Sequence, residues 1–474
     1  MTRAGLVLLA LASLSCDPRK FDDVADSAWI GVAERDSSQT GGDFGIDVIS
    51  VPMDGSETGA RFVVSAGGTT IPGLAQITYN EKGSKTAQIG GNGESGAKGI
   101  LAPLDDKGSP TSLVALPTGQ FIVGIADPDH ALYRFDKNFD NGTPLFGNLP
   151  AKSGDATAIG NLGLGDASTL DLVTVGEVTL TLLPDGDPNK TPITCGLKPP
   201  NASGSVAVLK QVLTTAKINS GANHDQIILS SRPKDEAAHG SCSSNTDCTT
   251  TAGTYCDLNE LTKVCHFPSK LLIIEPSAVA NGQDCPFTGI DVPRPGPVGI
   301  AVGNVDSNPL PDIVAGTILK AGDEDQQVTI YFNLNSSGVP DSKQVLTLSA
   351  DEKAGASTTR GTRILIANLE DEGMGLNEIV VADPDAVVNE QGSAGLVRIY
   401  RVTSTCDAAN QRGAACLLYE IFDPDPKNKE YFGRAMTIAQ FKTSKATTPI
   451  LAVGLKDRIW TYFRLSTKTP DPRL

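Results

Sequence analysis

The chain has 474 residues, with 49 glycines, 30 prolines and a formal net charge of −16 at pH 7. Frequent turn-forming residues and the scarcity of long amphipathic stretches argue against a mainly helical protein. The acidic balance disfavours nucleic acid and anionic membrane surfaces as partners, and it suits divalent cations or basic partners. Solubility alone would explain the same charge.

Residues 1–15 are typical of a secretory signal peptide. Arg3 supplies the positive start, and residues 5–14 form an apolar run shorter than the ~20 residues of a membrane-spanning helix. The small residues before Cys16 resemble the lipobox of bacterial lipoproteins. This resemblance implies that Cys16 carries a lipid and becomes the first residue of the mature chain. The alternative is an ordinary signal peptide with Cys16 as a spare thiol.

Residues 16–42 are polar and acidic and are interpreted as a tether, in which residues 28–34 (AWIGVAE) have the composition of a strand. Units of similar pattern then follow over residues 43–466. Each combines a small apolar strand, a loop, a second apolar strand and a third strand. The predicted strands are 44–51, 60–68 and 75–80; 112–117, 121–129 and 131–136; 156–162, 171–177 and 178–184; 205–212, 225–231 and 270–276; 298–305, 312–317 and 328–334; 363–369, 378–385 and 396–402; and 432–441, 449–455 and 458–465.

The clearest units lie at 159–176, 300–317 and 365–383, where the loop holds Asn and an acidic residue opens the second strand. A repeat of roughly 50–90 residues built on such hairpins favours a radial β architecture over an enzyme with one central core.

This pattern resembles the FG-GAP repeat of integrin alpha-subunit propellers and of related bacterial propellers. The dipeptides Phe44-Gly45 and Phe432-Gly433 carry the resemblance, together with the strand–loop–strand units. It implies an all-β fold, a seven-bladed β-propeller over residues 43–466. Because a propeller must close its ring and the last unit shows three strands, we predict that residues 28–34 supply its missing outer strand.

Removing Cys16 leaves eight cysteines, an even number that fits four disulfides in an exported chain. Zinc is the alternative for cysteine-rich stretches, but the sequence contains no CxxC pair. Cys195 and Cys285 bracket the fourth unit and are predicted to pair. Cys406 and Cys416 are predicted to staple a hairpin.

Residues 233–269 interrupt the fourth unit with a small disulfide-rich insert. Its four cysteines allow three pairings, of which we favour Cys242 with Cys256 and Cys248 with Cys265. The spacing resembles a cysteine-rich motif of exported proteins in some delta-proteobacteria. The insert should protrude from the outer part of its blade, as a recognition element or as a tolerated loop insertion without a partner.

The FG-GAP resemblance also implies calcium, bound by a nine-position loop whose alternate oxygen ligands turn inward. In the fifth unit the implied ligands are Asn304, Asp306, Asn308, the Leu310 carbonyl and Asp312; in the sixth they are Asn368, Glu370, Glu372 and Glu378. The third unit keeps only Asn161 and Asp171, and the other units have lost the ligands. The alternative is a turn rich in Asn and Asp that hydrogen-bonds itself.

No nucleophile-elbow, zinc-protease or phosphate-loop motif is present in the sequence. We therefore expect no catalytic residues and a binding function: adhesion to, or scaffolding of, a protein or glycan partner in the cell envelope. The lipid would anchor the chain to a bacterial membrane, with the outer membrane or cell surface favoured over the inner. The rivals are a polysaccharide-active enzyme that uses the central channel, and a purely structural envelope component.

Overall fold

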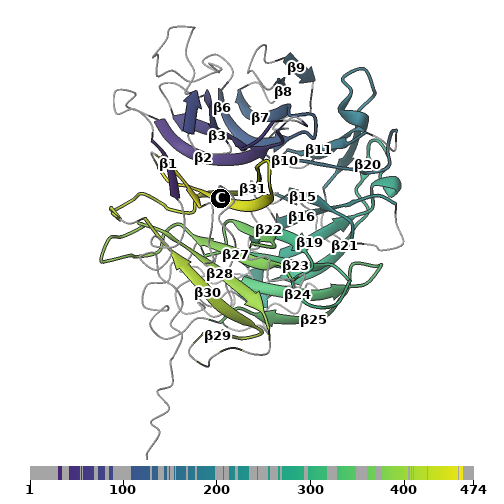
Figure 1. Cartoon of the computed structure of the whole chain (residues 1–474). Helices are drawn as coiled ribbons and strands as arrows, with labels where there is room; N and C mark the ends of the chain where they lie inside the picture. Colours follow the sequence, from purple (N-terminus) through teal and green to yellow (C-terminus); the bar gives the residue numbers. More distant parts are fainter. Residues whose placement is uncertain are drawn as a thin grey trace, which may run out of the picture.

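The computed structural model is an all-β protein in which seven sheets follow one another around a ring (Figure 1). It describes residues 30–34, 42–53, 55, 57–68, 73–80, 85–88, 108–128, 131–136, 143–146, 149, 154, 156–166, 169–176, 179–197, 206–207, 213–218, 223–233, 243, 255–256, 265–266, 269–292, 297–317, 328–347, 360–369, 376–403, 406, 408, 410–423, 425–456 and 458–462. Helical structure in these residues is limited to the 3-10 turns Pro184–Gly186 and Pro276–Ala278. None of the helices in the described part of the chain could cross a bilayer.

Each sheet is built mainly of antiparallel strands, and we refer to the sheets as blades one to seven. Blade one holds β2 (Gly42–Val51), β3 (Ala60–Gly68), β4 (Gly73–Tyr79) and β5 (Lys85–Gln88), and blade two holds β6 (Gly108–Ala115), β7 (Phe121–Pro128), β8 (Ala131–Phe135) and β9 (Thr143–Phe146). Blade three holds β10 (Ala156–Gly160), β11 (Asp171–Val175), β12 (Thr179–Leu183) and β13 (Ile193–Gly196), with the short β20 (Gln283–Asp284) parallel to β13. Blade four holds β14 (Val206–Ala207), β15 (Leu213–Ala216), β16 (Gln226–Pro233), β19 (Ser269–Ile274) and β21 (Thr288–Val292).

The remaining blades complete the ring. Blade five holds β22 (Pro297–Gly303), β23 (Asp312–Thr317), β24 (Val328–Leu334) and β25 (Pro340–Val345). Blade six holds β26 (Ile364–Ala367), β27 (Glu378–Asp383), β28 (Leu396–Val402), β29 (Gln411–Arg412) and β30 (Ala415–Ile421). Blade seven holds β31 (Ala435–Lys442), β32 (Thr447–Gly454), β33 (Arg458–Tyr462) and β1 (Ile30–Glu34).

One strand of each blade faces the centre of the ring; it is the first strand in every blade except blade four, where it is β15. The inner strands β2, β6, β10, β15, β22, β26 and β31 contact one another in that order, and β31 returns to contact β2. Figure 1 shows this return, with the yellow β31 beside the purple β2. The seven-bladed propeller predicted from the repeats is therefore confirmed.

The hydrophobic core is divided among the interfaces between neighbouring blades. Each of the seven interfaces holds its own cluster of buried apolar side chains. Side chains alternate along a strand, so Phe62 of β3 packs toward blade seven while its neighbour Val63 packs toward blade two. Strands buried on both faces need continuous apolar runs. The second strands, which are buried on both faces, therefore stand out in the sequence as continuous apolar runs.

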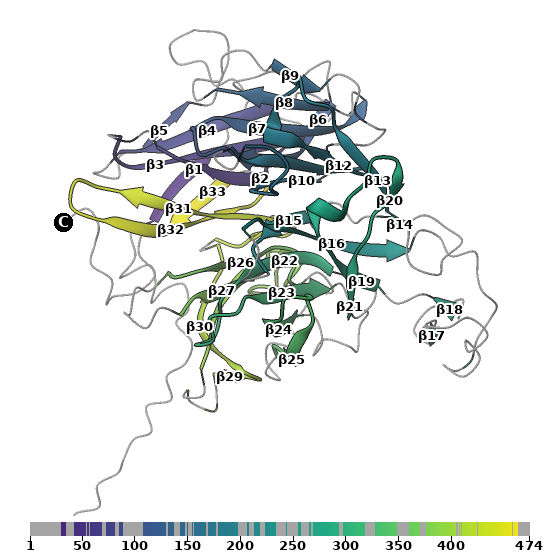
Figure 2. The same cartoon turned by 90° about the vertical axis from the view of Figure 1, so that its right-hand side faces the viewer.

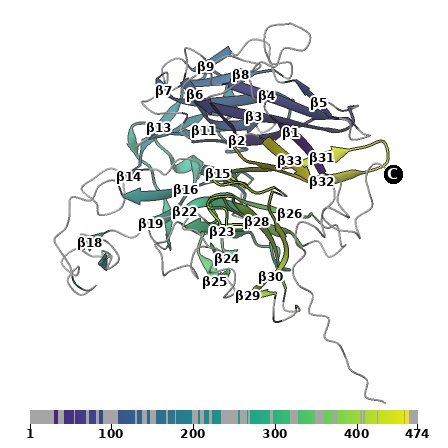
Figure 3. The same cartoon turned by 90° about the vertical axis from the view of Figure 1, so that its left-hand side faces the viewer.

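The N-terminal strand joins the last blade, which closes the ring. β1 pairs antiparallel with β33, from Ile30 opposite Tyr462 to Glu34 opposite Arg458 (Figure 3). Blade seven therefore gains its fourth strand from a segment that precedes blade one in the chain. Close to this junction, the Tyr79 hydroxyl of blade one donates to Thr461 Oγ1 at 3.2 Å.

The Phe-Gly dipeptides mark where an inner strand begins against the preceding blade. Gly45 and Gly433 have φ of +75° and +91°, a region that favours glycine. A Cβ at Gly45 would lie 2.7 Å from the Leu455 carbonyl oxygen of blade seven. Phe432, next to Gly433, is fully buried between blades six and seven. The dipeptides thus set how closely successive blades can approach.

Two differences from the predicted strands have clear physical causes. The first strand of the fourth unit was predicted over residues 205–212, where the structure has the short β14 and residues 208–212 lie outside the described part. The strand that contacts the neighbouring inner strands is β15 at Leu213–Ala216. Its residues are all half-buried and include two threonines, so they lack the apolar run on which the prediction relied. The outer strands were missed because they are short and polar. β25, for example, exposes four of its six residues.

Both disulfides predicted outside the insert are present in the structure. Cys195–Cys285 has a Cα–Cα distance of 5.0 Å and joins blade three to the connection between β19 and β21 of blade four. Its 90-residue separation corresponds to about 4–5 kcal/mol in the chain-entropy model. Cys406–Cys416 closes the hairpin before β30, with a Cα–Cα distance of 6.0 Å. Of the insert, β17 (Tyr255–Cys256) pairs with β18 (Cys265–His266), and the favoured insert disulfides lie outside the described residues.

We predict that the ring depends on β1 for stability. Deleting residues 17–36 removes β1 and leaves the edge of β33 unpaired, so the melting temperature should fall by roughly 5 °C or more. Deleting residues 17–27 keeps β1 and serves as the control. Equal melting of both variants and the full chain, measured by calorimetry, would show that β1 does not close the ring.

Candidate functional site

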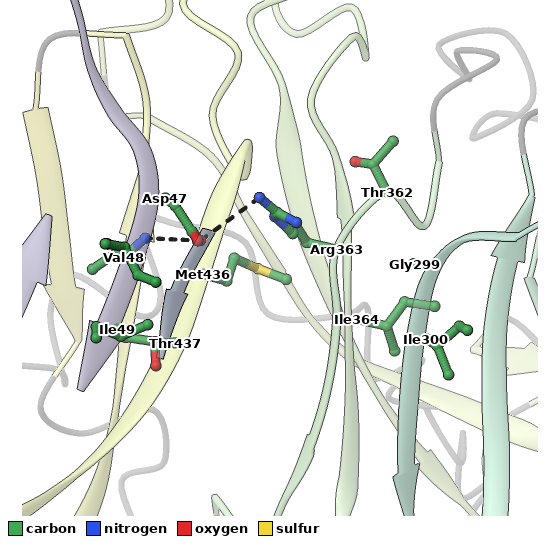
Figure 4. Close-up of a pocket in the computed structure, with 11 residues that line it drawn as sticks. Asp47, Val48, Ile49, Gly299, Ile300, Thr362, Arg363, Ile364, Met436 and Thr437 are labelled. Carbon is green, nitrogen blue, oxygen red and sulfur yellow. Dashed lines mark hydrogen bonds and ion pairs between the residues drawn. The ribbon is translucent and has the colours of Figure 1, made fainter. Parts of the chain in front are cut away.

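A cavity of about 220 Å³ lies among the inner strands and is the candidate binding site; we call it the central cavity (Figure 4). Its lining comes from blades one, two, five, six and seven: Asp47, Val48, Ile49, Leu113, Gly299, Ile300, Thr362, Arg363, Ile364, Met436 and Thr437. Most of these side chains are apolar. The charged groups are one carboxylate and one guanidinium.

Asp47 and Arg363 point toward one another in the central cavity, from β2 and from the residue before β26 (Figure 4). Arg363 Nη2 lies 3.6 Å from Asp47 Oδ1, which is an ion-pair contact but too long for a hydrogen bond. A register shift between Phe44 and Asp47 bends β2 at this point. Asp47 is held in place by hydrogen bonds of its own, since its backbone N–H donates to Ser65 Oγ at 2.9 Å and its Oδ1 accepts from Val48 N–H at 3.1 Å.

Arg363 links three blades across the junction that closes the ring. It belongs to blade six, its Nε donates to the Arg434 carbonyl oxygen next to blade seven at 3.2 Å, and its guanidinium faces Asp47 of blade one. Burial raises the pKa of Asp47, and the positive charge of Arg363 opposes that rise. The side chains of both residues keep some exposure to the cavity, 16% for Arg363 and 21% for Asp47.

The central cavity does not assemble the carboxylate pair of a glycoside hydrolase. That chemistry needs two carboxyl groups flanking the scissile bond, about 5–10 Å apart. Among the residues that line the described cavity, Asp47 is the single carboxylate. The lining also contains no histidine, cysteine or serine that could act as a nucleophile or base.

The predicted calcium loop of blade five is a turn closed by its own hydrogen bonds. Asp312, at the start of β23, is fully buried, and its carboxylate accepts Val305 N–H and Asn333 N–H, both at 2.8 Å. Asp306 Oδ1 accepts Asn308 N–H at 2.7 Å, and Asn308 Oδ1 accepts the N–H of Leu310 at 3.1 Å.

Two further blades use a buried acid in the same position. Asp171 begins β11, and its carboxylate accepts Leu162 N–H at 2.9 Å and Asp185 N–H at 2.8 Å. Glu378 begins β27, where Oε2 accepts Leu369 N–H at 2.6 Å and Oε1 lies 2.6 Å from Arg401 Nη2. In all three cases one acidic residue joins the incoming loop to the strand that follows.

Blade four uses a neutral residue for this purpose. Gln226 begins β16, and its Oε1 accepts Ile218 N–H at 2.9 Å. Burial raises the pKa of both Asp171 and Asp312, while the backbone N–H donors lower it. The acids at these positions are therefore stabilised by donors of the protein itself.

Several of the predicted calcium ligands take part in hydrogen bonds within the loop of blade five. The Asn304 amide nitrogen contacts the Asn308 carbonyl oxygen, and Asn304 Oδ1 is buried without a hydrogen-bond partner among the described residues. Asp312 directs both oxygens at backbone N–H groups. In blade six the charge of Glu378 is already paired with Arg401, and Glu370 and Glu372 lie outside the described residues. No group of three or more His, Cys, Asp or Glu gathers in metal-binding proximity within the described ranges. Calcium therefore stays a prediction of the sequence.

The comparisons with known proteins leave the family open. The chain matches no known protein family, and no curated protein is significantly similar to it in sequence. The only support for the likeness to FG-GAP propellers is therefore the two Phe-Gly dipeptides and the strand–loop–strand units of the sequence. The propeller fold is supported independently, by the ring of seven sheets.

We predict that the buried acid of blade five is essential for stability. Asp312→Ala leaves two buried N–H groups without an acceptor, which should lower the free energy of unfolding by about 2–5 kcal/mol in urea titrations. Asp306→Asn keeps an acceptor oxygen at a half-buried position, so the free energy of unfolding should change by less than about 1 kcal/mol. If both substitutions had the same small effect, the role assigned to Asp312 would be wrong.

Proposed function

We propose that this chain is an exported, lipid-anchored propeller that binds or scaffolds a protein or glycan partner in the cell envelope. The lipid is carried by Cys16, and the outer membrane or the cell surface is the favoured location. The FG-GAP-like repeats and the signal sequence support this proposal from the sequence side. The fold supports it because a closed ring of sheets holds its connecting loops on a rigid frame.

The composition of the central cavity is the observation that favours a binding function over an enzymatic one. A single carboxylate beside a guanidinium favours recognition over hydrolysis. A polysaccharide-active enzyme would need a second acid there, and the lining residues do not provide one. The enzyme alternative is therefore disfavoured.

The disulfide-rich insert is the proposed contact with the partner. It leaves the sheet after β16 and returns at β19, both of which lie in blade four. Figure 2 shows its hairpin, β17 and β18, outside the ring of blades, and Figure 3 shows β18 there from another side. A small stapled module beside a large rigid body can reach a partner without disturbing the blades.

The test compares the full chain with a variant in which a short Gly-Ser linker replaces residues 234–268. This removes four cysteines together, so no odd thiol remains. Binding to purified outer-membrane and cell-wall fractions of the source bacterium is measured by co-sedimentation, with the deletion of residues 17–27 as the control. We expect at least a ~10-fold loss of binding for the insert variant at an unchanged melting temperature. Unchanged binding, or release of soluble sugars from the cell-wall fraction by the full chain, would contradict the proposal.

A further inference from the structure

The central cavity contains a guanidinium whose hydrogen-bonding capacity is largely unused. Arg363 has five N–H donors, and among the described residues only Nε has an acceptor, the Arg434 carbonyl oxygen. Its contact with Asp47, at 3.6 Å, exceeds hydrogen-bond length. The remaining donors need partners, because polar atoms left unsatisfied in a protein interior are unfavourable.

The arrangement of these groups limits the charge of a ligand. Arg363 offers donors to a carboxylate, and a guanidinium can bind a carboxylate through two parallel hydrogen bonds. Asp47 stands directly opposite and would repel a simple anion, as Arg363 would repel a simple cation. A ligand with one positive and one negative group satisfies both residues at once. It also keeps the cavity neutral overall, which avoids an unpaired buried charge.

The size and the walls of the cavity limit the rest of the ligand. A volume of about 220 Å³ holds roughly seven waters and lies below the usual range for drug-sized ligands. The cavity is also lined by Leu113, Ile300, Ile364 and Met436. Methionine side chains adapt readily to the shape of what they contact. A compact apolar group fits these walls.

We propose that the central cavity binds a free α-amino acid with an apolar side chain. The ligand carboxylate accepts hydrogen bonds from Arg363, its ammonium group donates to Asp47, and its side chain packs against Ile300, Ile364 and Met436. The ligand would then bridge blades one and six across the ring closure. This site is distinct from the insert proposed to contact the envelope partner, so either proposal can fail without the other.

Titration calorimetry of the full chain with L-leucine tests this proposal. Isocaproate, which lacks the ammonium group, and isoamylamine, which lacks the carboxylate, are the matched probes. We expect leucine to bind and each analogue to bind at least ~10-fold more weakly, because each leaves one charged residue unpaired. Absence of leucine binding, or equal binding of the analogues, would overturn the proposal.

Substitutions locate the site. Asp47→Asn and Arg363→Lys should each weaken leucine binding at least ~10-fold. Asp291→Asn is the control, since it removes the same charge from the exposed Lys270–Asp291 pair on blade four and should leave binding unchanged. Equal weakening by all three variants would place the amino acid elsewhere. The analogue series on the unmodified chain decides the question if a cavity variant fails to fold.

Discussion

Three buried carboxylates, each at the first residue of a second strand, determine how the blades of this propeller are built. Asp171, Asp312 and Glu378 are almost completely buried, and each accepts the backbone N–H of the loop that leads into its strand. Without them, these donors would be unsatisfied inside the protein, which is strongly unfavourable. The loops between inner and second strands can therefore close tightly, and this lets the inner strands pack around one centre.

The ring adds a second requirement, because every blade is apolar on both faces and needs a neighbour on each side. Blade seven meets this requirement in two places. On the outside, β1 pairs with β33, and on the inside Arg363 connects blade six to blades seven and one. The proposed amino-acid site lies at this inner junction. Ligand binding and ring stability would therefore depend on the same residues.

The features that could be predicted from the sequence are those that depend on residues close together in the chain. Second strands are continuous apolar runs, the acids that open them stand out at 171, 312 and 378, and the strand at 28–34 was needed to complete the last blade. The outer strands could not be found, because edge strands such as β25 have little apolar character. The pairing of Asp47 with Arg363 could not be found either. It depends on ring closure, which brings together residues far apart in the chain. The burial of Arg360 could not be predicted either, because it depends on the Tyr400 hydroxyl, to which the guanidinium donates at 2.7 Å.

The claim that the buried carboxylates hold the blade turns through their own hydrogen bonds is tested most directly by amide hydrogen exchange. The decisive amides are those of Leu162, Val305 and Leu369, which donate to the buried acids. The account predicts that they exchange as slowly as the strand amides, both in calcium and after chelation. Rapid exchange after chelation that becomes slow only when calcium is added would contradict it. That result would mean that the turn of blade five binds calcium, as its resemblance to the FG-GAP loop implies.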